Sequence, residues 1–179
     1  RDLADVFCST SEGVRAERAK IWGLVDEIAK LNRFDDVRNE LVSELTAQSS
    51  RPKEATGVKL TKLKRNIDSE GIHYSIIDVN INRASRTASI SIKAPPASLS
   101  SDVDSIHKEG ASWWPLTFAR ELDDAILLLR TNELEIGTWI FQTSGSVENV
   151  LKMDRILHEH RENWFVKETL GYLRRALAR

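Results

Sequence analysis

Two neighbouring stretches of alternating apolar and polar residues constrain the fold most. In residues 74–83 an apolar side chain stands at every second position from Ile77 to Ile81, and residues 87–94 repeat the pattern. Such alternation is typical of strands that bury one face. Only the short polar segment 82–86 separates the two stretches, so the sequence predicts a β-hairpin, which Pro95 and Pro96 would end.

A helix and a third strand are predicted after the hairpin. From Thr117 onward apolar residues recur at helical spacing, and they are Phe118, Leu122, Ala125, Ile126 and Leu129. The polar residues between them, Glu121, Asp123, Asp124 and Arg130, are expected on the outside. Residues 136–143 are mostly apolar and predict a buried strand, with further helices over 147–158 and 163–179. This order of elements indicates an α/β fold.

The first part of the chain has a different pattern. A short helix over 14–22 is expected to end at Gly23, which would act as its C-cap. A longer helix would begin after Asn32 as N-cap and end near Gln48, with Phe34, Val37, Leu41 and Leu45 on one face. We therefore expect three regions: a helical block 1–52, a polar connector 53–70, and an α/β block 71–179.

Composition excludes several classes of protein. The 26 basic and 27 acidic side chains give a net charge of −1, which argues against an electrostatic grip on nucleic acid or an anionic membrane. No apolar run approaches the roughly 18 residues that span a bilayer. The single cysteine, Cys8, excludes an intramolecular disulfide framework and a cysteine-rich zinc site, and it suits the reducing cytoplasm.

Both ends of the chain indicate a segment of a longer polypeptide. The only methionine is Met153, so translation is not expected to start at Arg1. The last helical pattern runs to Arg179 without a glycine or proline that would end it.

Two groups of reactive residues have a simpler interpretation. His158 and His160, with Glu159 and Glu162, resemble a metal cluster, but side chains two positions apart lie about 200° apart around a helix. We therefore expect a solvated helix end and no metal. Cys8 has no neighbouring base and is expected to be a buried thiol rather than a nucleophile.

The remaining candidates concern ligands and contacts. Trp113 and Trp114 are adjacent and cannot easily face one core, so one of them is a candidate for a subunit or domain contact. The cations of the last helix could meet a phosphate, although a solvated face is favoured; they are Lys167, Arg174, Arg175 and Arg179. No phosphate-cradling loop is built by Gly137, Gly145 and Gly171.

Parts of the sequence resemble the crotonase (enoyl-CoA hydratase/isomerase) superfamily. The first block is similar to the end of a catalytic half in that family, through Ala16, Ala19, Gly23, Leu24, Val25, Asp26 and Ile28. Residues 71–179 are similar to the start of a second half, through Glu121, Leu122, Ala125, the strand 136–143 and the turn at Gly145. Longer runs resemble the two-unit, ring-opening lyases of this superfamily, and these are 7–9, 12–15, 113–116, 118–126, 130–140 and 164–177.

This resemblance implies a crotonase-like fold of ββα units, in which the chain is a middle segment that joins two halves. The parent protein would be a carbon–carbon lyase that opens the ring of a 2,3-epoxide or dihydrodiol of benzoyl-CoA to an aldehyde acyl-CoA and releases formate. It implies a coenzyme A thioester as substrate, no cofactor, and a homo-oligomer of the full-length protein, with a dimer as the expected form.

The segment lacks the residues that the family uses for catalysis. The family's acid–base glutamates would lie upstream of Arg1, and the Ala-Gly-Asp-like run expected near Gly145 is replaced by Ser146, Val147 and Glu148. No catalytic residue is therefore assigned, the residues that would contact coenzyme A are unknown, and the segment alone is expected to be inactive. Two alternatives stay open: an acyl-CoA hydratase or isomerase fusion, and a non-catalytic dimerisation module.

Overall fold

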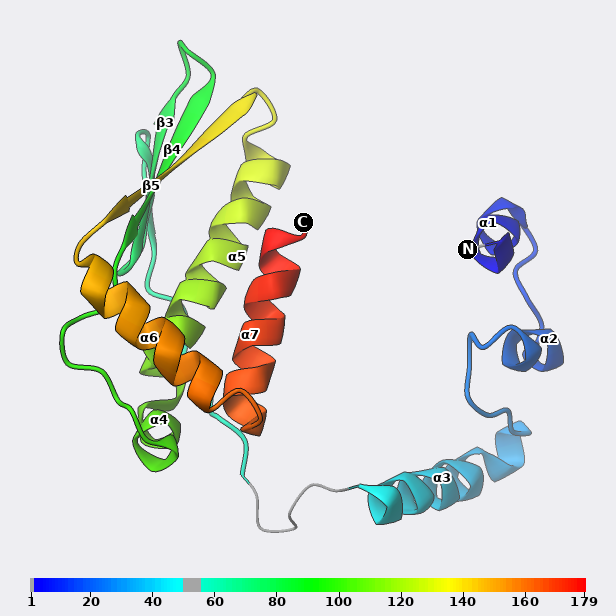
Figure 1. Cartoon of the computed structure of the whole chain (residues 1–179). Coiled ribbons are helices and arrows are strands. Elements are labelled where there is room, and N and C mark those ends of the chain that lie inside the picture. Colours follow the sequence, from blue (N-terminus) through cyan, green and yellow to red (C-terminus); the bar gives the residue numbers. More distant parts are fainter. Residues whose placement is uncertain (1, 50–55) are drawn as a thin grey trace. The chain divides into compact units, whose positions relative to one another are not determined.

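The chain forms two compact units, Arg1–Ala55 and Thr56–Arg179. The computed structural model describes residues 2–49 and 56–179 (Figure 1). The mixture of helices with a five-stranded sheet confirms the α/β class. The assignment of the two blocks to two crotonase-like halves stays a prediction.

The first unit consists of helices and turns. Its elements are α1 (Asp2–Ser9), α2 (Ala16–Ile21), a 3-10 helix (Leu31–Arg33) and α3 (Phe34–Gln48). Gly23 has a φ of +68°, a conformation that glycine adopts at little cost, and the N–H of Leu24 donates to the carbonyl of Ala19 at 2.9 Å. The predicted C-cap at Gly23 is therefore confirmed.

Asn32 does not cap α3, so that prediction is wrong. It lies inside the 3-10 helix, and Arg33 flanks α3 without a side-chain cap. The apolar side of α3 is largely open, since Phe34 is 54% and Leu45 is 58% exposed. Among the described residues of this unit only Ala19 is buried, so most of its apolar surface has no partner within the unit.

The second unit contains a five-stranded sheet in which the strands follow one another in chain order. The first four are antiparallel neighbours, whereas the last pairs with the fourth in parallel. The strands are β1 (Asn66–Ile67), β2 (Gly71–His73), β3 (Ile77–Asn82), β4 (Thr87–Lys93) and β5 (Thr138–Ser144).

The hairpin predicted over 74–94 is confirmed, since β3 and β4 pair from Ile77 opposite Ile92 to Asn82 opposite Thr87. Strands β1 and β2 were not predicted. They are two and three residues long, which is too short for alternation to be recognised, and β1 lies inside the segment expected to be a polar connector.

Helix α5 (Trp114–Asn132) covers one face of the sheet, and α7 (Trp164–Leu177) lies beside α5 (Figure 1). Ile77 and Ile90 of the sheet and Leu122 of α5 are fully buried in the core that results. The helix begins at Trp114, earlier than the expected Thr117, because Pro115 occupies its first turn, where no N–H is needed.

Two features of this core differ from expectation. Glu121 and Asp123 were expected outside, but they are only 2% and 8% exposed. The strand predicted over 136–143 forms as β5, yet it lies at the edge of the sheet and is mostly exposed, with Ile140 at 41% and Phe141 at 50%. An apolar run in the sequence does not distinguish a central strand from an edge strand.

A second cluster forms where the remaining helices meet. These are α4 (Val103–Glu109), a 3-10 helix (Gly110–Ser112) and α6 (Val147–Glu159), together with the start of α7. Ile106, Trp113 and Val166 are completely or almost completely buried there. Asn163 begins α7, because its side chain accepts hydrogen bonds from the N–H groups of Phe165 and Val166.

Candidate functional site

The second unit contains an open groove of about 600 Å3. Segment 61–64 before β1 forms one wall, segment 96–100 after β4 forms another, and the start of α5 forms the floor. A volume of this size falls within the range of small-molecule sites.

The groove combines cations, hydroxyls and an indole surface. Lys62 and Lys64 lie on the wall formed by 61–64, and Arg120 lies on α5. Trp114 is partly buried, stacks on Phe118 with ring centroids 5.1 Å apart, and is one of the residues that line the groove. Cations beside a flat aromatic surface suit a ligand that carries both phosphate and a planar ring.

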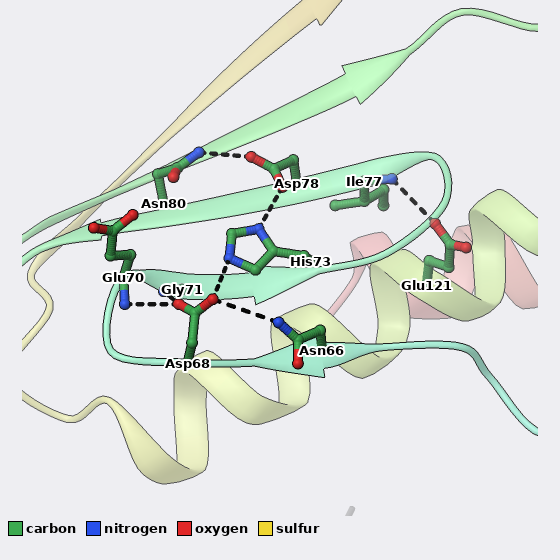
Figure 2. A network of polar contacts seen from close by, with 9 residues as sticks. All are labelled: Asn66, Asp68, Glu70, Gly71, His73, Ile77, Asp78, Asn80 and Glu121. Carbon is green, nitrogen blue, oxygen red and sulfur yellow. Dashed lines mark hydrogen bonds and ion pairs between the residues drawn. The ribbon is translucent and has the colours of Figure 1, made fainter.

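Glu121 lies at the base of this groove, but it is an anchor rather than a free acid. One carboxylate oxygen accepts from the backbone N–H and the hydroxyl of Ser75. The other accepts from the N–H groups of Ile76 and Ile77 at 2.8 and 3.0 Å. Both oxygens are therefore occupied, and the carboxylate holds the turn between β2 and β3 against α5 (Figure 2).

Polar contacts also fix the wall that carries the lysines. Arg65 donates to both oxygens of Asp124 at 2.6 Å, and the hydroxyl of Tyr74 donates to the same carboxylate at 2.8 Å. Arg120 donates to the carbonyl of Thr61 at 2.5 Å. Burial, with the neighbouring Asp124, raises the pKa of Tyr74 far above its ordinary value, so this phenol stays protonated and acts as a donor.

A histidine of β2 lies between two carboxylates (Figure 2). Nδ1 of His73 lies 2.6 Å from Asp78, and Nε2 lies 3.2 Å from Asp68. Asp68 also accepts from the N–H groups of Glu70 and Gly71, so it closes the turn between β1 and β2. The hydrogen bond that His73 donates to Asp78, supported by Asp68, raises the pKa of His73.

The residues that were considered as a metal cluster, and for which a solvated helix end was expected, do not converge. His160 contacts the backbone carbonyl of Ser101 at 2.7 Å, whereas His158 lies 2.9 Å from Arg161. Over residues 2–49 and 56–179, no group of three potential ligands is placed to hold a metal ion. His158 and His160 therefore have separate partners.

Cys8 was expected to be a buried thiol, and that expectation is wrong, because the structure places it exposed on α1. Helix α1 contributes no buried side chain whose packing could cover the thiol, at least among the residues whose burial is described.

The two adjacent tryptophans serve different clusters. Trp113 is 1% exposed and packs on Phe165, with ring centroids 5.3 Å apart, while Trp114 packs against the sheet core. They do not share one core, as expected, and both contribute to packing inside the second unit. A role for either in a subunit contact stays a prediction.

The cations of α7 and the cation of Arg179, which follows it, are not among the residues that line the groove. Lys167, Arg174 and Arg175 are exposed, and Arg179 forms an ion pair with Asp123 at 3.2 Å. Of the three glycines, Gly145 has a φ of +115°, and a Cβ there would lie 2.6 Å from that of Ala94, so it is required by the close approach of two backbones.

Comparison with known proteins identifies a relative over the whole chain. All 179 residues align with the benzoyl-CoA-dihydrodiol lyase of Aromatoleum evansii at 47% identity. The chain is similar to part of this lyase. It spans 32% of the length of the lyase, and no protein-family model matches it. The resemblance to a lyase of benzoyl-CoA derivatives is thereby confirmed, whereas the ring-opening reaction and the crotonase superfamily stay predictions.

The comparison with benzoyl-CoA-dihydrodiol lyase does not assign roles to residues. The polar contacts of Glu121 and of His73 could not be predicted from the sequence alone. Glu121 and His73 gave no signal, because their partners lie on other strands and turns.

Within the described ranges, no helix combines the length and apolar composition that crossing a bilayer requires.

Proposed function

We propose that this chain is part of a lyase that acts on a benzoyl-CoA derivative. The parent protein would open the ring of a 2,3-epoxide or dihydrodiol of benzoyl-CoA to an aldehyde acyl-CoA and release formate. One observation carries the proposal: all 179 residues of the chain align, at 47% identity, with the benzoyl-CoA-dihydrodiol lyase of Aromatoleum evansii.

The groove gives this proposal a physical basis. Coenzyme A carries phosphates and an adenine ring, and the groove offers Lys62, Lys64 and Arg120 beside the indole of Trp114. Charge-assisted hydrogen bonds to phosphate and stacking on an aromatic face would favour such a ligand. Under this proposal the groove binds the coenzyme A part of the substrate, in a crotonase-like fold and without a further cofactor.

Catalytic groups are proposed to come from elsewhere in the parent protein. Both oxygens of Glu121 are occupied by hydrogen bonds, and Glu109, the other carboxylate at the groove, accepts from Ser100. The proposed roles of this segment are therefore to join two halves of a cytoplasmic enzyme and to bind substrate, and alone it would be inactive.

A turnover assay tests the reaction. The full-length protein and the 179-residue chain are each given the 2,3-epoxide of benzoyl-CoA, and formate and aldehyde are measured. We expect both products from the full-length protein and none from the chain alone. Hydration or isomerisation of an acyl-CoA without formate would instead favour the hydratase or isomerase fusion.

Binding of coenzyme A tests the groove separately. In the full-length protein, replacing Lys62 and Lys64 by alanine is expected to weaken binding by about tenfold, or about 1.4 kcal/mol. Replacing Lys167 and Arg174 on α7 is the matched control and should leave the dissociation constant unchanged. An equal affinity for both double variants would remove the groove from the proposal while leaving the reaction untouched.

The alternative of a dimerisation module has one specific observation in its favour. The edge strand β5 exposes Ile140 and Phe141, and exposed apolar edges attract further strands. Sedimentation of the full-length protein with Phe141→Lys tests this alternative. If the alternative is right, the variant forms a smaller oligomer than the unmodified protein.

A further inference from the structure

His73 lies at the centre of a polar contact network on the sheet face opposite α5. Its neighbour in the chain, Ile72, belongs to the core under that helix, and successive side chains of a strand point to opposite faces. Across the sheet, His73 pairs with Asn66 of β1 and with Asp78 of β3. Figure 2 shows the ring between the carboxylates of Asp78 and Asp68.

The charge of the imidazole decides how many of these contacts are favourable. A neutral ring has one N–H donor and one lone pair, so it can donate to only one carboxylate. The lone pair then faces the other carboxylate, which is repulsive. A protonated ring donates from both nitrogens, to Asp78 at 2.6 Å and to Asp68 at 3.2 Å.

The surroundings of the ring contain negative and neutral groups. Asp68 and Glu70 belong to the turn between β1 and β2, Asp78 and Asn80 belong to β3, and Asn66 belongs to β1. In the part of the chain that the structure describes, the contacts of Asp68 and Asp78 involve no lysine or arginine. His73 is therefore their cationic partner.

We propose that protonated His73 is a pH-sensitive clamp that joins the β1–β2 turn to β3 and so supports the pairing of β1 and β2. Strands of two and three residues form few ladder hydrogen bonds of their own, so a side-chain clamp has a large share in keeping them paired. Asp68 is the link, because it accepts from the backbone of the turn and from His73.

The direction of the pH dependence follows from the contacts. Both carboxylates raise the pKa of His73 in the folded chain. The clamp is then complete below about pH 6.5, the ordinary value for histidine, and is lost as pH rises through the raised pKa. Lys64 lies only two residues before β1, but Arg65 and Arg120 hold this end of the groove wall independently of the clamp.

Nuclear magnetic resonance of the 179-residue chain tests the clamp. The titration of the His73 ring is followed together with hydrogen-exchange protection factors for amides 66–73. We expect a His73 midpoint above 6.5, and a fall of at least threefold in protection of these amides across that midpoint. Amides of β3 and β4 that pair with each other should keep their protection.

Three variants make the result specific. His73→Gln should give low, pH-independent protection of amides 66–73, whereas Asp78→Asn should lower the His73 midpoint. His107→Gln, a histidine outside the network, should leave the pH dependence intact. Constant protection of amides 66–73 across the His73 titration, or a midpoint at or below 6.5, would overturn the proposal.

Discussion

The carboxylate of Glu121, on α5, accepts a hydrogen bond of 3.0 Å from the backbone N–H of Ile77, which begins β3. The same carboxylate accepts from the N–H groups of Ser75 and Ile76. A side chain on the helix therefore supplies the acceptors that three consecutive amides of a turn require. Helix and sheet are joined here by a buried charge as well as by apolar packing.

Replacement of Glu121 by glutamine should destabilise the second unit strongly. Glutamine keeps one oxygen but turns an NH2 group toward amide donors, so at least one buried N–H loses its acceptor. We expect a loss of about 3 kcal/mol in the free energy of unfolding, measured by urea denaturation. Glu168→Gln, on the exposed face of α7, is the matched control and should change stability by less than about 0.5 kcal/mol. Similar values for both variants would contradict the anchoring role.

Gly71 should tolerate no side chain. A Cβ at this position would lie 1.8 Å from the carbonyl oxygen of Val79 on the neighbouring strand, which cannot move without breaking the β2–β3 ladder. Gly71→Ala is expected to cost about 3 kcal/mol by urea denaturation. Gly137→Ala meets nothing within 4 Å and should be close to neutral, so equal effects would show that space at β2 is not limiting.

The two asparagines near helix starts should differ in their contribution to stability. Asn163 caps α7 through the N–H groups of Phe165 and Val166, so Asn163→Ala should cost about 1 kcal/mol. Asn32 lies within a 3-10 helix and makes no cap, so Asn32→Ala should have little effect. Thermal denaturation monitored by circular dichroism measures both. A larger loss for Asn32→Ala would contradict the assigned start of α3.

Acid should weaken the link between the β3–β4 turn and the end of α5. Arg83 donates to both oxygens of Glu133, at 2.5 and 3.0 Å, and this hydrogen bonding lowers the pKa of Glu133. A lowered pKa in the folded state means that the stabilisation is complete above the ordinary value near 4.5 and is lost as pH falls through the lowered value. Between pH 6 and pH 3, the melting temperature of the Glu133→Gln variant should therefore fall less steeply than that of the unmodified chain. An unchanged slope would show that the ion pair does not contribute.

Periodicity was sufficient for the parts of the fold that depend on local pattern. Alternation around Ile77 and Val79 predicted the β3–β4 hairpin, and helical spacing of Leu122 and Leu129 predicted α5. Gly23 was identified as a C-cap because the positive φ needed there strongly favours glycine. These signals depend on residues within a few positions of one another.

The remainder depends on partners distant in the sequence. The helical pattern places the polar side chain of Glu121 in solvent. In the structure its carboxylate oxygens instead accept hydrogen bonds from a turn that lies more than forty residues earlier in the chain. His73 likewise depends on Asp78 across a strand pair that was not predicted. Phe141 lies in an apolar run that suggested burial, but the position of β5 at the sheet edge leaves it half exposed.

The parallel pairing of β4 with β5 has a consequence for how the chain folds. The β3–β4 hairpin closes a short loop and can form within microseconds, whereas β5 can join only after α4 and α5 have crossed back over the sheet. Docking of β5 should then be the late step of refolding. While residues from Thr138 onward are still inside the ribosome, the edge of β4 that later pairs with β5 has no partner strand. A chaperone would be most useful during that interval.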